Sequence, residues 1–155
     1  MGGVAAETAG RVRFGVLGPL AVWRDGEPVG LGGERQRSLL ALLLIRANEL
    51  VSVEVLVDAL FGEAPSDGAV HAVRVAVSRL RRLLENGDEH PVLETRPGGY
   101  VLAVEPERLD AARFERLLSD GRGLLSAGDP ASSAARLRDA LSLWRGAPLA
   151  DLPVD

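Results

Sequence analysis

The sequence of 155 residues contains no cysteine, so disulfides, thiolate zinc sites and cysteine nucleophiles are excluded together. Two histidines leave little for metal chemistry or for a Ser-His-acid triad. No apolar run reaches the roughly eighteen residues of a membrane span, and Met1 to Gly10 lacks the basic and apolar regions of a secretory signal. We therefore expect a cytoplasmic protein with no membrane contact, no cofactor, no metal and no enzymatic activity.

Lysine is absent as well, because all 18 basic residues are arginine. The net charge of -4 argues against a nucleic-acid binder if it is taken as an average over the chain. The basic residues are nevertheless concentrated between Ala69 and Leu84, where no acidic residue occurs until Glu85. With 46% hydrophobic and 26% charged residues, the chain can form a buried core.

The first third of the chain predicts a small antiparallel sheet after a disordered tail at residues 1–11. Apolar residues alternate at Val12, Phe14 and Val16, which is the period of a strand with one buried face. A second strand is expected from Leu20 to Arg24, and Asp25-Gly26 favours a type I′ hairpin turn.

Three helices and a hairpin are expected next. Residues 34–47 are apolar nearly all round, which predicts a buried helix, and Ser52 is a suitable N-cap for a short second helix. The third helix is expected over residues 68–85, with its core stripe at Val73, Val77, Leu80 and Leu84. Residues 92–104 predict a hairpin with the glycine-rich tip Arg96-Pro97-Gly98-Gly99.

The third helix has the most functional content. At about 100° per residue, a second face of this helix carries His71, Arg74, Ser78 and Arg81, flanked by Arg79 and Arg82. A helix fits the major groove, and arginine can donate two hydrogen bonds to guanine. A solvated cationic face is the alternative for an isolated arginine-rich helix. Here, however, a hairpin follows whose Arg96 could enter a minor groove, which indicates a winged helix-turn-helix.

The last third predicts a second, all-α domain from residue 105 to residue 155. Asp110 can cap one helix, and Asp129 with Pro130 starts another, so two antiparallel helices form a TPR-like hairpin. Such arrays usually need about three repeats, which predicts that this domain is incomplete. The expected fold class is therefore an α+β winged helix-turn-helix with an N-terminal antiparallel sheet over residues 12–104, followed by an all-α TPR-like helical hairpin.

Five motifs in this order and spacing resemble the Streptomyces antibiotic regulatory protein (SARP) family over almost the whole chain beyond Arg11. They are Arg13-Phe-Gly-Val-Leu-Gly-Pro-Leu, Glu34-Arg-Gln-Arg-Ser-Leu-Leu-Ala-Leu-Leu-Leu, Val73-Arg-Val-Ala-Val-Ser-Arg-Leu-Arg-Arg-Leu, Thr95-Arg-Pro-Gly-Gly-Tyr and Leu143-Trp-Arg-Gly-Ala-Pro-Leu. The resemblance implies an OmpR/PhoB-type winged helix and a bacterial transcriptional activator domain. It also implies binding to direct repeats of double-stranded DNA near promoters, as a homodimer on tandem repeats, and contact with RNA polymerase.

The resemblance assigns roles to individual residues. Arg74, Ser78 and Arg81 match the base-reading positions of the recognition helix, and Arg96 matches the residue of the wing at residues 95–100. We expect His71, Arg79, Arg82, Arg35 and Arg37 to contact phosphates. Ala76 departs from the family, which commonly has an aromatic residue or histidine there, so a backbone contact from that position is expected to be missing.

Two other functions compete with this reading. The first is a protein-interaction adaptor in which the TPR-like hairpin has the function and DNA is not bound specifically. The second is a small hydrolase, which the lack of cysteine and the shortage of histidine disfavour.

Overall fold

The computed structural model describes residues 12–62, 67–85 and 92–152. The expectations for the tail, for Pro65-Ser66 and for a helix stop at Asn86-Gly87-Asp88 lie outside these residues. By their contacts, Met1–Val12 and Val22–Val104 form a first unit, and Arg13–Ala21 and Glu105–Asp155 form a second unit. The second unit thus begins again at Glu105 but also includes residues 13–21. The expected domain boundary at residue 105 stays a prediction.

The N-terminal antiparallel sheet is confirmed. It has the strand order β1 (Val12–Gly15), β2 (Ala21–Arg24) and β3 (Glu27–Pro28). Strands β2 and β3 are antiparallel with Arg24 opposite Glu27, so Asp25 and Gly26 form the two-residue turn. Their φ angles of 53° and 83° are both positive, as the expected type I′ turn requires.

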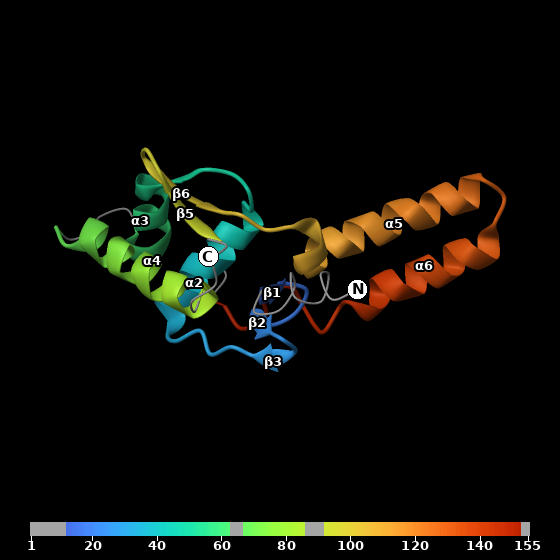
Figure 1. Ribbon diagram of the computed structural model, residues 1–155, viewed down its shortest axis with the longest axis horizontal. Helices are drawn as coiled ribbons and strands as arrows, with labels where there is room; N and C mark the ends of the chain where they lie inside the picture. The colour runs from blue at the N-terminus through green and yellow to red at the C-terminus, as the bar shows by residue number, and fades with distance from the viewer. Residues whose placement is uncertain (1–11, 63–66, 86–91, 153–155) are drawn as a thin grey trace, which may run out of the picture. The chain divides into compact units, whose positions relative to one another are not determined.

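Helices α2 (Glu34–Ile45), α3 (Val53–Phe61) and α4 (Ala69–Glu85) form the helical part of the first unit (Figure 1). The Ser52 hydroxyl accepts a hydrogen bond from the Val55 N–H at 3.2 Å, so the expected N-cap of α3 is confirmed. The predicted core stripe of α4 is buried, as are the leucines that α2 contributes to the same core. These residues are Leu39, Leu40, Leu43, Leu44, Val73, Val77, Leu80 and Leu84.

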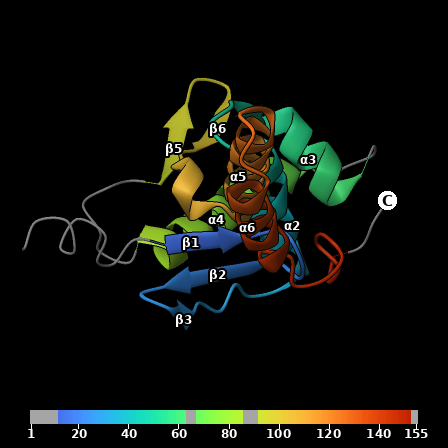
Figure 2. The same ribbon diagram turned by 90° about the vertical axis from the view of Figure 1, so that its right-hand side faces the viewer.

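A second sheet has the order β4 (Val51–Ser52), β6 (Gly99–Leu102) and β5 (Leu93–Arg96), and Figure 2 shows the β5–β6 hairpin. Arg96 pairs with Gly99, which leaves Pro97 and Gly98 as the turn. Gly98 has a φ of 85°, which favours glycine. At Gly99 a Cβ atom would overlap the Val51 carbonyl oxygen, so the β4 and β6 backbones approach too closely for a side chain.

The second unit contains a 3-10 turn (Pro106–Arg108) and the antiparallel helices α5 (Asp110–Ser126) and α6 (Pro130–Ser142) (Figure 1). The Asp129 carboxylate accepts a hydrogen bond from the Ser132 N–H at 3.1 Å, which confirms it as the N-cap of α6. Hydrogen bonding to Ser132 also lowers the pKa of Asp129 below its ordinary value. Whether this hairpin is TPR-like stays a prediction.

Asp110 has a different role from the expected helix cap. The N-cap position of α5 is Leu109, and Asp110 is its first helical residue. The Asp110 carboxylate accepts hydrogen bonds from the N–H groups of Val16 at 2.9 Å and Leu17 at 3.0 Å, more than ninety residues away in the chain. Asp110 therefore fixes the segment after β1 within the second unit.

Candidate nucleic-acid interface

The face of α4 opposite its core stripe is exposed and basic. His71, Arg74, Ser78, Arg79 and Arg82 are all exposed, and α4 has no acidic residue in its first turn. Within the described part of the chain, none of these five side chains has a hydrogen-bond or ion-pair partner. Arg74, Arg79 and Arg82 therefore have their positive charge available for an anionic surface, whereas Arg81, which the sequence placed on the same face, is not fully exposed.

Arg81, the third predicted base-reading residue, is half-buried and already bonded within the protein. Its Nε donates to the Leu93 carbonyl oxygen at 3.1 Å, and its Nη2 donates to the Thr95 hydroxyl at 2.9 Å. The planar guanidinium thus connects α4 to strand β5, and two of its five N–H groups are used in doing so. The sequence did not indicate this connection.

The hairpin tip carries the predicted wing residue. Arg96 is exposed and forms an ion pair with Glu94, two residues away on β5, with an N–O distance of 2.6 Å. Exposed pairs of this kind contribute little to stability, so Arg96 can exchange Glu94 for a phosphate or a groove edge at small cost.

Two residues that the sequence analysis did not select hold α4 in place. Arg24 on β2 donates from Nη2 to the Leu83 and Leu84 carbonyl oxygens at 2.6 and 2.9 Å, which satisfies carbonyls at the C-terminal end of α4. The Glu85 carboxylate accepts from the N–H groups of Val92 and Leu93 at the start of β5. The positive charge of Arg24 is also favoured there, because it lies at the negative, C-terminal end of the α4 helix dipole.

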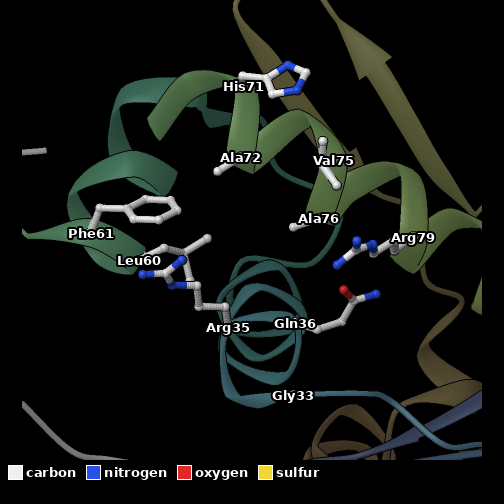
Figure 3. A pocket seen from close by; sticks show the side chains of 10 residues that line it. All are labelled: Gly33, Arg35, Gln36, Leu60, Phe61, His71, Ala72, Val75, Ala76 and Arg79. Carbon is white, nitrogen blue, oxygen red and sulfur yellow. The ribbon is translucent and has the colours of Figure 1, made fainter. Parts of the chain in front are cut away.

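A pocket of about 410 Å³ lies beside α4 in the first unit (Figure 3). It is lined by Gly33, Arg35, Gln36, Leu60, Phe61, His71, Ala72, Val75, Ala76 and Arg79. The Arg35 guanidinium lies 4.4 Å from the centre of the Phe61 ring, a cation–π contact. Arg37, the other basic residue expected to contact phosphate from α2, is half-buried and does not line the pocket.

Two negative findings concern residues 12–62, 67–85 and 92–152. This part of the chain has no group of three or more histidine, aspartate and glutamate residues that could hold a metal ion. It also has no helix of the length and apolarity needed to cross a membrane.

Two family models match successive parts of the chain. Residues 26–102 match "Transcriptional regulatory protein, C terminal", and residues 109–155 match "Bacterial transcriptional activator domain". The first match covers all three helices of the first unit and the β5–β6 hairpin, and the second covers α5 and α6.

Curated relatives match over nearly the whole chain. The regulatory protein AfsR of Streptomyces coelicolor is 45% identical over 148 residues, which cover 95% of this chain and 14% of AfsR. The transcriptional regulatory protein EmbR of Mycobacterium tuberculosis is 39% identical over 92% of this chain and 37% of EmbR. DnrI of Streptomyces peucetius is 33% identical over 91% of this chain and 54% of DnrI. The chain thus spans between about a seventh and about half of these relatives.

A solved structure of Mycobacterium tuberculosis EmbR, in complex with a low-affinity phosphopeptide, matches with a TM-score of 0.87 and 39% identity. The match covers 92% of this chain and 38% of EmbR. The element order, the exposed basic helix and the hairpin beside it define an OmpR/PhoB-type winged helix, as found in DNA-binding transcriptional regulators. The chain belongs to the SARP family within that class, as its sequence motifs indicated.

Proposed function

We propose that the chain binds double-stranded DNA sequence-specifically, with α4 in the major groove and the β5–β6 hairpin at the adjacent minor groove. It regulates transcription, most simply as an activator, and has no enzymatic activity. Its place of action is the cytoplasm.

One observation carries this proposal. Helix α4 buries one apolar stripe completely and presents unpaired arginine on the opposite face, although the chain as a whole has a net charge of -4. A helix of about 10 to 12 Å diameter fits the major groove of about 12 Å width, so the exposed face can reach base edges.

The candidate DNA-contacting residues are assigned to base or phosphate contacts according to their exposure and their bonds within the protein. Arg74 and Ser78 are exposed near the middle of this face, so we assign them to base contacts. Arg81 was expected in the same group, and we assign its free N–H groups to DNA while its Nε and Nη2 hold the wing. Phosphate and minor-groove contacts are assigned to His71, Arg79, Arg82, Arg35, Arg37 and Arg96.

Selection of bound duplexes from a random library with the purified chain tests the proposal. A recovered consensus, bound more weakly as salt increases, is the expected result, because phosphate contacts release counterions. Tandem copies of that consensus would support side-by-side binding of two chains on direct repeats. A pool without enrichment would contradict sequence-specific binding.

The family also suggests RNA polymerase as a partner and a homodimer on tandem repeats, and we include both in the proposal. Contact with polymerase would be tested by transcription in vitro from a promoter that carries the selected repeats. Unchanged transcript levels on addition of the chain would contradict activation.

A protein-interaction adaptor remains the second candidate because of the second unit. There Leu125 and Leu141 are 59% and 66% exposed, which is unusual for leucines on the facing helices of a hairpin. If the selection gives no consensus and DNA binding is independent of salt, the adaptor function is favoured.

A further inference from the structure

A short segment of the second unit precedes the winged helix in the sequence. Residues 13–21, which we call the strap, lie outside both family matches, yet their contacts place them in the second unit. The N–H groups of Val16 and Leu17 donate to the Asp110 carboxylate at 2.9 and 3.0 Å, and Asp110 is only 8% exposed. Hydrogen bonds to a carboxylate are strong because the acceptor is charged. The first residue of α5 therefore holds the middle of the strap.

The segment that follows α6 also holds the strap. The Arg145 N–H donates to the Leu17 carbonyl oxygen at 2.8 Å, and the Arg145 Nη2 donates to the Pro19 carbonyl oxygen at 2.8 Å. The Leu20 N–H donates to the Asp151 carboxylate at 2.8 Å. The strap is thus bonded both to the beginning of the α5–α6 hairpin and to the residues after its end.

Gly18, in the middle of the strap, is packed closely against Arg145. Its φ of 147° is one that residues with a side chain rarely adopt. A Cβ atom at this position would lie 2.9 Å from the Arg145 Cβ atom, closer than real Cβ contacts allow. Any side chain at residue 18 would therefore displace the strap, Arg145 or both.

The strap continues directly into strand β2, which carries Arg24. Leu20 is bonded to Asp151, and Arg24 follows four residues later, about 13 Å along an extended strand. An extended chain has little length in reserve, so a displacement of the strap away from β2 pulls on Arg24. Arg24 in turn donates to the last carbonyl oxygens of α4. A continuous stretch of chain and one side chain thus connect the strap to α4.

We propose that Asp110 is a positioning residue for DNA binding. By holding the strap it fixes β2 and Arg24, and through Arg24 it fixes the C-terminal end of α4. This role rests on the proposed function, in which α4 enters the major groove, and Asp110 itself contacts no DNA. The second unit thereby regulates affinity, because any change that releases the strap from Asp110 weakens DNA binding.

A double-mutant cycle in the full chain of 155 residues tests the proposal, with the duplex recovered by selection as the probe. Asp110→Asn replaces one acceptor oxygen by an N–H₂ donor, and Arg24→Gln removes the guanidinium that holds α4. Each should weaken binding about three- to tenfold, within the range of couplings carried between distant sites. The double variant should bind no more weakly than the weaker single variant, because both break the same connection.

The direction of the Asp110→Asn effect separates positioning from net charge. The substitution removes a negative charge from a chain of net charge -4, which by itself favours binding to phosphates. Weaker binding therefore reports the loss of the strap bonds. Hydrogen exchange checks that the strap is released, since the N–H groups of Val16 and Leu17 should exchange faster in this variant.

Two further variants separate the strap from the stability of the second unit. Gly18→Ala displaces the strap without altering Asp110, so it should reproduce the loss of affinity even if Asp110→Asn folds poorly. Ser133→Ala is the matched control, because the Ser133 hydroxyl is buried in the same unit and donates to the Gly121 carbonyl oxygen, away from the strap. Its affinity for the duplex should equal that of the wild type.

The outcomes distinguish failure of this role from failure of the proposed function. Wild-type affinity in Asp110→Asn and Gly18→Ala, with faster exchange at Val16 and Leu17, would show that the chain binds DNA without positioning by the strap. Losses that multiply in the double variant, or an equal loss in Ser133→Ala, would also overturn the role of Asp110. If the wild type binds no duplex, the proposed function is wrong and this role with it.

Discussion

The two units bury their helices to very different extents. In the first unit, Val73, Leu80 and Leu84 on α4 are almost completely inaccessible to solvent. In the second unit, α5 and α6 pack against each other, yet Leu125, Leu141 and Trp144 are 59%, 66% and 39% exposed. Trp144 contacts Phe114 edge-to-face with ring centres 5.4 Å apart, so even this aromatic pair is partly open.

The difference follows from how many elements surround each helix. Helix α4 has α2 and α3 on its apolar side, so its stripe can be buried while its basic face stays free. Helix α6 has α5 as its main neighbour, and a pair of helices covers only one side of each. The first unit therefore encloses the apolar side of its helices, whereas the second leaves large apolar side chains exposed.

The largest expected effect is on the free energy of unfolding, and it distinguishes buried Leu80 on α4 from exposed Leu141 on α6. Leu80→Ala should lower the free energy of unfolding by about 2 to 5 kcal/mol, because it leaves a cavity in a closed core. Leu141→Ala should change it by less than about 0.5 kcal/mol, since Leu141 is mostly exposed. Urea denaturation of both variants measures the contrast, and equal losses would show that α6 is covered in solution.

Loss of a base contact should come next. Arg74→Ala should weaken binding to the selected duplex by about 1 to 3 kcal/mol and relax specificity at one position. Arg138→Ala removes the same charge from an exposed position on α6 and serves as the control. Binding titrations on matched and mismatched duplexes give both quantities. If the two variants weaken binding equally, the effect of Arg74 is only its charge.

A smaller effect is expected where Arg81 holds the wing. Thr95→Val removes the hydroxyl that accepts from Arg81, which should cost up to about 1 kcal/mol of binding free energy because the hairpin is less well fixed. Thr95→Ser keeps the hydroxyl and should bind like the wild type. The same affinity for Thr95→Val and Thr95→Ser would mean that the hydrogen bond does not position the wing.

The smallest effect concerns pH and the second unit alone. Hydrogen bonding to Ser132 lowers the pKa of Asp129 below the ordinary value of 3.8. The ionised carboxylate therefore stabilises the fold at pH values above 3.8, and this stabilisation is lost as the pH falls through the folded-state pKa. Asp129→Ala should lower the melting temperature at pH 7 and lower it less at pH 2. Thermal unfolding followed by circular dichroism measures both; an equal decrease at the two pH values would contradict the capping role.

Local features could be predicted from the sequence because their causes are local. The Asp25-Gly26 turn needs two residues that tolerate positive φ, and the caps at Ser52 and Asp129 need an oxygen three residues before an N–H group. The outward face of α4 follows from the helical repeat and its core stripe. These signals lie within a few neighbouring residues.

The missed features depend on residues far apart in the chain. Arg24 bonds to carbonyls 59 and 60 positions later, and Asp110 bonds to N–H groups 94 and 93 positions earlier. Gln36 was missed for another reason. It stands among charged residues of a first turn, which usually indicate a solvated surface, and only the packing of α3 and α4 around it makes it buried.

The close contact at Gly99 separates a part of the hairpin that does not tolerate substitution from a part that does. Any side chain at residue 99 would meet the Val51 backbone, so in descendants of this gene the base of the wing can keep only glycine. Arg96 and Pro97 are exposed beyond that contact and can be exchanged without repacking. Substitutions can therefore accumulate at the tip while the close backbone contact at the base of the hairpin is inherited unchanged.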